Sequence, residues 1–108
     1  MGTSANVYIK TKDKNLKYNF SMDGGFSTLG INMLSDLNYK IDNFLEKFEE
    51  ENQYDFDDKY QNYVYYIDLD KPSMKVFEVD KGEPIDISKE AFEFLKNQRR
   101  DLLHLIEI

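Results

Sequence analysis

The sequence contains no cysteine and no tryptophan, and it has one histidine and two prolines. Without cysteine, the chain forms no disulfide, offers no thiolate nucleophile and cannot hold a cysteine-ligated metal or iron–sulfur cluster. The histidine, His104, lies in an apolar C-terminal segment, where we expect it to be packed or at the surface. The serines lack the Gly-x-Ser-x-Gly context of a nucleophile elbow. These absences favour a protein that is not an enzyme.

Long hydrophobic runs are also missing. No stretch approaches the roughly 18 consecutive apolar residues that identify a membrane-spanning helix. Residues 1–6 have neither the positive charge nor the apolar run of a secretory signal peptide. We therefore expect a cytoplasmic protein with no membrane partner.

Aromatic residues, in contrast, are abundant, with eight tyrosines and eight phenylalanines among 108 residues. Disordered chains are poor in aromatic residues, and a chain of this length can bury about 65% of its unfolded surface. We therefore expect residues 1–108 to form a single α+β domain. Residues 1–5 are expected to contribute no ordered structure to it.

Positive charge is scarce. The chain has 21 acidic residues against 14 lysines and arginines, which gives a net charge of −7. Residues 36–58 hold nine acidic residues and two lysines, so this stretch alone carries a charge of −7. Binding to nucleic acid needs cations that displace phosphate counterions, so we predict no direct contact with nucleic acid. The acidic stretch instead favours a basic protein partner.

Alternating polar and apolar residues predict the strands. Residues 6–11 and 16–20 are expected to form a hairpin, with Val7 and Ile9 on one face and Tyr8 and Lys10 on the other. Residues 63–69 are aromatic or β-branched on both faces, which predicts a central strand. Residues 74–79 are expected to pair with it after a turn.

Two helices are expected. Ser27 or Thr28 is placed to cap the first helix, and Ser88 to cap the second. Residues 102–108, from Leu102 to Ile108, are apolar on too many sides for a lone surface helix, and helix, strand and pairing with another chain remain open. The predicted order is ββαββα, an antiparallel sheet with two helices packed on one face. The first helix has an apolar stripe formed by Leu34, Leu37, Ile41, Phe44, Leu45 and Phe48.

The acidic stretch is the leading candidate for a partner-binding site. Carboxylates can pair with arginine and lysine on a partner, and the interleaved aromatic rings supply apolar contact area. The alternative is a solvated surface that only keeps the protein soluble. The candidate residues are Glu46, Glu49, Glu50, Glu51, Tyr54, Asp55, Phe56, Asp57, Asp58 and Tyr60.

Known metal and phosphate motifs fail in this sequence. An EF-hand loop starting at Asp55 would need Gly at its sixth position and Glu at its twelfth, where Tyr60 and Tyr66 stand. The glycines around residue 25 lack the Gly-Lys-Ser or Gly-Lys-Thr ending of a phosphate loop and the spacing of a dinucleotide fingerprint. We therefore expect no metal and no cofactor.

The tyrosines offer a second surface. On a sheet face, tyrosine rings can form a platform that stacks on bases, with nearby lysines attracting the phosphates. Packing in the core and between neighbouring strands explains most of these rings more simply. The residues concerned are Tyr8, Tyr18, Tyr63, Tyr65 and Tyr66, with Lys10, Lys12, Lys14 and Lys17.

The sequence thus predicts a small acidic binding protein that occupies a basic surface of a protein partner, such as a nuclease or another nucleic-acid-binding protein. An immunity-protein-like molecule, or a phage-encoded inhibitor of a host nuclease or defence system, fits this description. Lysine outnumbers arginine twelve to two, which hints at an AT-rich bacterial or phage source. The alternative is a self-associating structural or accessory module that dimerises through Leu102–Ile108.

Overall fold

Five strands and three α-helices make up the part of the chain that the structure describes. The computed structural model describes residues 3–13, 15–20, 23–51 and 62–108, with the side chains of residues 47–51 outside that description. The strands are β1 (Ala5–Lys10), β2 (Asn15–Phe20), β3 (Tyr63–Asp68), β4 (Ser73–Asp80) and β5 (Glu83–Asp86). The α-helices are α1 (Ile31–Tyr39), α2 (Ile41–Glu51) and α3 (Ser88–Gln98). A π-helical turn, η1 (Phe26–Gly30), precedes α1, and a 3₁₀-helix, η2 (Arg100–Leu105), follows α3.

The five strands form one mixed sheet in the order β2-β1-β3-β4-β5. The prediction that β3 is central is confirmed, but the prediction of a wholly antiparallel sheet is wrong, because β1 and β3 run parallel. The connection between β2 and β3 contains α1 and α2, and β3 starts at the end of the sheet where β1 begins. Strand β3 lies on the side of β1 that is not paired with β2, and Ala5 pairs with Tyr63. Local hairpin signals carry no information about such a long-range pairing.

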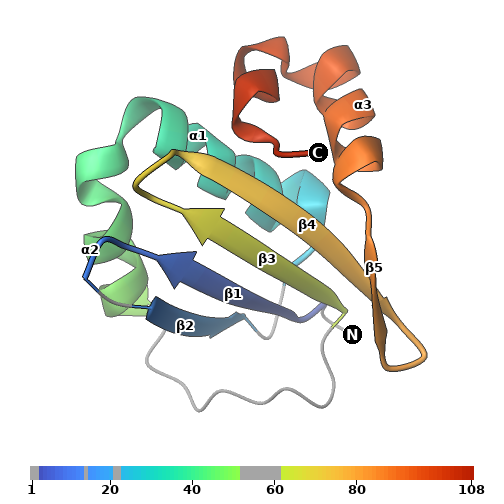
Figure 1. Cartoon of the computed structure of the whole chain (residues 1–108), viewed down its shortest axis with the longest axis horizontal. Helices are drawn as coiled ribbons and strands as arrows, with labels where there is room; N and C mark the ends of the chain where they lie inside the picture. Colours follow the sequence, from blue (N-terminus) through green and yellow to red (C-terminus); the bar gives the residue numbers. More distant parts are fainter. Residues whose placement is uncertain (1–2, 14, 21–22, 52–61) are drawn as a thin grey trace.

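The hydrophobic core lies on one face of the sheet. Val7 and Ile9 are buried there as predicted, in register with the buried Tyr65 and Ile67 of β3. Leu34, Leu37, Phe44, Ala91 and Leu95 from the helices are buried in the same core cluster. Figure 1 shows α1 crossing behind β3 and β4, while the opposite face of the sheet is turned toward the viewer. That opposite face carries none of the described helices.

The predicted long first helix is divided. Lys40 interrupts it with φ −139° and ψ 41°, so α1 and α2 are separate helices. Neither Ser27 nor Thr28 caps α1, which follows η1 directly. The Thr28 hydroxyl donates instead to the carbonyl oxygens of Asp23 and Gly25, at 2.7 and 3.1 Å. None of the described helices is long and apolar enough to cross a membrane.

Strand β5 was not predicted. It contains Pro84, which lacks an N–H and is tolerated in a sheet at an edge, where β5 lies. Lys81 and Gly82 have φ values of 52° and 81° and join Asp80 to Glu83. Two positive φ values in a two-residue loop define a type I′ hairpin turn, in which glycine is favoured.

Helix α3 begins at the expected residue, but Ser88 does not cap it. The Ser88 hydroxyl is buried and accepts the backbone N–H of Val76 on β4 at 3.1 Å. Asp86 provides the hydrogen bond at the start of the helix instead, since its carboxylate accepts the Ser88 N–H at 2.8 Å. Ile87 and Phe92 are partly buried and pack against the core cluster.

Both ends of the described chain join the fold. Ser4 donates its N–H to the side chain of Asn62 at 3.0 Å, and Ala5 already belongs to β1 and is fully buried. At the other end, residues 100–105 form η2, and Ile106 makes a parallel bridge to Met74. The C-terminal segment is therefore a 3₁₀-helix followed by a single bridge, which decides between the helical and extended alternatives and leaves pairing with another chain a prediction.

Candidate functional site

The uncovered face of the sheet displays the residues that alternate with the core side chains. Its central row follows the register of four strands. Lys17 on β2 lies opposite Tyr8 on β1, and Tyr8 lies opposite Tyr66 on β3. Lys75 on β4 lies opposite Tyr66 and completes the row. We call these four residues the central row.

The aromatic rings of this face contact one another. Tyr8 and Tyr66 stack with their centroids 4.9 Å apart and their planes 12° from parallel. Phe77 meets Tyr66 edge-on at 5.3 Å. The Lys17 ammonium lies 5.9 Å from the centre of the Tyr8 ring, within cation–π range. Tyr66 nevertheless remains 48% exposed, so the rings form a surface and not a closed core.

A recess of about 410 Å³ lies at one end of this face. We call it the basic recess, because Lys10, Lys17 and Lys75 all line it. Tyr8 and Tyr66 also line it, so the recess combines flat rings with positive charge. Its polar lining is completed by Asn15, Asp68, Ser73 and Glu107.

The other end of the face is apolar. A smaller hollow of about 180 Å³ lies there. It is bordered by Val64, Val79 and Pro84, and by Tyr8 and Tyr66 of the central row. Phe77 lies on the same face, in register with Val64. We call this region the apolar end. It is the part of the face that is farthest from the three lysines of the basic recess.

The β4–β5 hairpin at the apolar end is rich in acidic residues. Figure 1 shows the β4–β5 hairpin reaching beyond the helices at one corner of the sheet. Its exposed acids are Glu78, Asp80, Glu83 and Asp86, and its two lysines, Lys75 and Lys81, are also exposed. Asp80 and Glu83 lie directly opposite each other across the hairpin. Like charges in that position destabilise a hairpin, so this arrangement has a cost in folding free energy.

The structure describes little of the acidic stretch that the sequence singled out. Glu46 is exposed on α2, as a partner-binding role requires. Glu49, Glu50 and Glu51 belong to α2, but their side chains lie outside the description. Tyr54, Asp55, Phe56, Asp57, Asp58 and Tyr60 lie outside the described residues. The role of this stretch stays a prediction.

The tyrosine platform proposed from the sequence is divided between the two faces. Tyr8 and Tyr66 lie on the uncovered face, whereas Tyr18, Tyr63 and Tyr65 lie on the face toward the helices. Burial raises the pKa of Tyr65 well above its usual value, and it also raises the pKa of Tyr63. These three rings are therefore structural.

Sequence reasoning missed two members of the uncovered face, Lys75 and Phe77. Both lie on β4 and alternate with the buried Met74 and Val76. This alternation was visible in the sequence. Their place beside Tyr66 depends on the register between β3 and β4, which the sequence did not supply.

The C-terminal segment proposed for dimerisation is largely buried within its own chain. Leu102 and Leu105 are 0% and 2% exposed, and Ile106 is 7% exposed. Ile108 is the exposed apolar residue, at 72%. His104 is exposed and lies away from both the basic recess and the apolar end. A dimer through Leu102–Ile108 stays a prediction, with a much smaller apolar surface than the sequence indicated.

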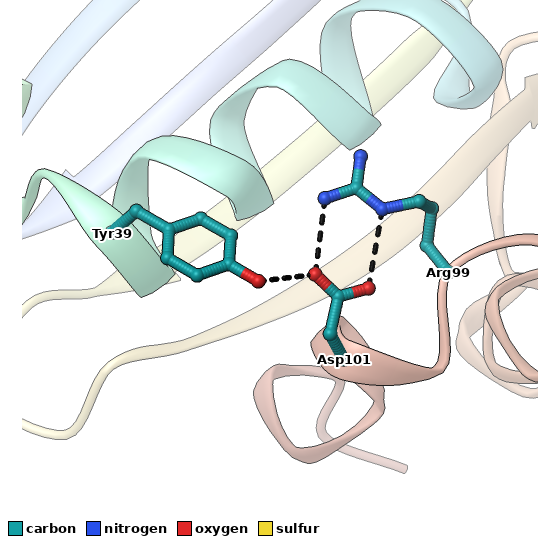
Figure 2. A network of polar contacts seen from close by, with 3 residues as sticks. All are labelled: Tyr39, Arg99 and Asp101. Carbon is teal, nitrogen blue, oxygen red and sulfur yellow. Dashed lines mark hydrogen bonds and ion pairs between the residues drawn. The ribbon is translucent and has the colours of Figure 1, made fainter.

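A polar network connects α1 with η2 (Figure 2). The Tyr39 hydroxyl donates to Asp101 Oδ2 at 2.5 Å, and Arg99 donates two hydrogen bonds to the same carboxylate, each at 3.1 Å. These bonds from Arg99 and Tyr39 lower the pKa of Asp101 to about 2. The Tyr39 hydroxyl and two nitrogens of Arg99 face the two oxygens of Asp101, so we interpret the network as a structural contact between two elements.

Among the residues that the structure describes, no group of three or more histidine, aspartate or glutamate side chains is placed to hold a metal ion. Comparison of the chain with protein-family models, with curated proteins and with solved structures gave no match. The class defined by the fold and the site is therefore a small α+β domain with a five-stranded mixed sheet and one uncovered aromatic face.

Proposed function

We propose that this chain is a non-enzymatic binding protein that docks on a basic protein through the apolar end of its uncovered sheet face and the acidic β4–β5 hairpin. The observation that carries the proposal is the position of Phe77, Val79 and Pro84 on a face that carries none of the described helices, in a hairpin with four exposed acids. An immunity-protein-like molecule or a phage-encoded inhibitor of a nuclease belongs to this class of binding protein.

The apolar end supplies what the centre of a protein interface needs. Interface cores are depleted in charge and enriched in aromatic residues, and a few such residues carry most of the binding free energy. Phe77 and Tyr66 contact each other edge to face, so both rings are held in place before a partner arrives. Prior ordering of these rings reduces the entropy that binding has to overcome.

The acidic residues of the hairpin favour a positively charged partner. Glu78, Asp80, Glu83 and Asp86 lie on the hairpin that carries Val79 and Pro84, and their charge is complementary to lysine and arginine on the partner. The net charge of −7 attracts the same kind of partner over a longer range. The unfavourable Asp80–Glu83 pair is consistent with a role in binding, because folding alone gains nothing from it.

A charge-reversal experiment tests this proposal. The wild-type protein captures partners from a lysate of its native source at low and high salt, and mass spectrometry identifies them. We expect a cationic protein that is retained at low salt and weakened at high salt. With the purified partner, the double variant Asp80→Lys/Glu83→Lys should bind about tenfold or more weakly, mainly through a slower association rate.

Two further variants separate the possible surfaces. Asp13→Lys/Asp70→Lys makes the same change in charge in two turns at the opposite end of the sheet, and it should bind like the wild type. A variant with Glu49, Glu50, Asp57 and Asp58 replaced by Lys tests the acidic stretch predicted from the sequence. Wild-type affinity in the hairpin variant would overturn the proposal. Recovery of only the protein itself would favour the self-associating module.

A further inference from the structure

The basic recess has the size and lining of a small-molecule site. Its volume of about 410 Å³ falls within the range of ligand pockets, roughly 300–1,000 Å³. It lies at the opposite end of the uncovered face from the acidic hairpin, and it shares Tyr8 and Tyr66 with the apolar end. Its lining has two parts, a pair of stacked rings and a group of cations.

The positive charge in the recess exceeds the negative charge available to neutralise it. Asp68 uses Oδ1 to accept the backbone N–H groups of Asp70 and Lys71, at 3.0 and 3.2 Å. Glu107 forms an ion pair with Lys71 at 3.5 Å. Within the described part of the chain, neither Lys10 nor Lys75 forms an ion pair. The recess therefore retains cations that an anionic ligand can bind.

Ser73 provides an independent observation. Its side chain lines the basic recess and is 5% exposed, yet among the described residues its hydroxyl oxygen has no hydrogen-bond partner. Buried hydroxyl groups almost always have a partner, and leaving one without a partner costs free energy. A ligand oxygen in the recess would satisfy this group, and Lys75 lies two residues along the same strand face.

The rings define the other half of the ligand. Tyr8 and Tyr66 are nearly parallel, and Tyr66 is 48% exposed, so an aromatic surface remains open to a further flat ring. Stacking of this kind accepts any aromatic base and needs no specific hydrogen bonds. Lys17 and Lys75 stand at the two ends of the row that contains these rings.

We infer that the basic recess binds a flat aromatic anion of the mononucleotide class, with its base on Tyr8 and Tyr66 and its phosphate between Ser73 and the lysines. A long single strand fits the site less well. Affinity for a polyanion grows with the number of phosphates that are neutralised, and three lysines on a chain of net charge −7 provide few. A single phosphate requires no extended cationic track.

The test uses the full chain with adenosine, guanosine, cytidine and uridine 5′-monophosphates as probes. Heteronuclear NMR titration should shift the backbone signals of β1, β3 and β4 around Tyr8, Tyr66 and Ser73, with Kd in roughly the millimolar range or below. The variant Lys10→Gln/Lys75→Gln should weaken binding about tenfold, which corresponds to ~1.4 kcal/mol. The matched variant Lys89→Gln/Lys96→Gln on α3 should bind like the wild type.

Several outcomes overturn the inference. These are no shifts up to about 5 mM nucleotide, or equal binding by both lysine variants. Inorganic phosphate that binds as tightly as the nucleotides would show an anion site without stacking. An oligonucleotide that binds while the monophosphates do not would identify a single-strand surface instead. Because none of these variants changes the hairpin acids or Phe77, Val79 and Pro84, failure here leaves the proposed protein interface untouched, and the reverse also holds.

Discussion

At the scale of single residues, Tyr65 illustrates how one side chain fixes a long-range contact. Its ring is fully buried, and its hydroxyl donates to the carbonyl oxygen of Gly24 at 2.6 Å. Gly24 is itself placed against β1, because a Cβ atom on it would lie 2.8 Å from the Cβ of Ala5. Contacts below about 3.0 Å of this kind do not occur without a shift of the backbone. Tyr65 therefore connects the central strand to the turn that begins the helical connection.

We expect Tyr65→Phe to lower the free energy of unfolding by about 1–2 kcal/mol, because it leaves the Gly24 carbonyl buried without its donor. Chemical denaturation followed by circular dichroism measures this change. Tyr66→Phe is the matched control, since the neighbouring tyrosine is 48% exposed and its loss of a hydroxyl should change stability by less than about 0.5 kcal/mol. Equal effects of the two substitutions would contradict this account of Tyr65.

At the scale of elements, the network of Tyr39, Arg99 and Asp101 joins the end of α1 to the start of η2 (Figure 2). The two elements are far apart in sequence, and the network forms at the place where α3 ends at Gln98. Arg99 donates to both carboxylate oxygens of Asp101. Such a two-point contact fixes the orientation of the two side chains as well as the distance between them. The network thus positions the segment that carries the last core residues.

This network predicts a dependence of stability on acid pH. The pKa of Asp101 is about 2 in the folded protein, below its ordinary value of 3.8, because Arg99 and Tyr39 donate hydrogen bonds to the ionised form. Its contribution to stability is therefore complete above pH 3.8 and is lost as the pH falls through about 2.

Thermal unfolding of the wild type and of Asp101→Asn between about pH 5 and 2 measures this contribution. The variant should melt at a lower temperature at pH 5, and the difference should shrink as the pH falls. Glu93→Gln, an exposed residue on α3, should melt in parallel with the wild type. A difference between Asp101→Asn and wild type that is constant with pH would contradict a role for the charge.

At the scale of the whole molecule, the C-terminal segment completes the core. Leu102, Leu105 and Ile106 are buried with the side chains of the helices and of β4. Ile106 bridges to Met74, and the Glu107 N–H donates to the Met74 carbonyl oxygen at 3.1 Å. The last residues of the chain thus contact the sheet directly beside the strand that carries Lys75 and Phe77. Loss of this segment would affect the whole domain and not a separable tail.

We expect truncation after Arg100 to abolish cooperative unfolding. Loss of a large buried aliphatic side chain costs about 2–5 kcal/mol, and three such losses compare with a total stability of about 5–15 kcal/mol for a typical domain. Deletion of Ile108 alone, which is 72% exposed, should leave the unfolding midpoint nearly unchanged. Circular dichroism and size-exclusion chromatography distinguish the possibilities. A truncated protein that remains a folded monomer would contradict this expectation and favour the self-association alternative.

The sequence by itself determined the features that depend on local periodicity. Alternation placed Val7 and Ile9 inside and Tyr8 and Lys10 outside, because successive side chains of a strand point to opposite faces. The helical stripe identified Leu34, Leu37 and Phe44 for the same kind of reason. The aromatic and β-branched content of β3 identified the central strand. Each of these inferences uses neighbours in the chain alone.

The tertiary structure decided everything that depends on which distant residues meet. The parallel pairing of β1 with β3 places Tyr8 beside Tyr66, and the register of β4 places Lys75 at the end of the same row. The two halves of the uncovered face, one basic and one apolar, exist only because of these pairings. The strand order depends on how the long connection between β2 and β3, with its helices, packs against one face of the sheet. No local pattern in the sequence encodes that choice.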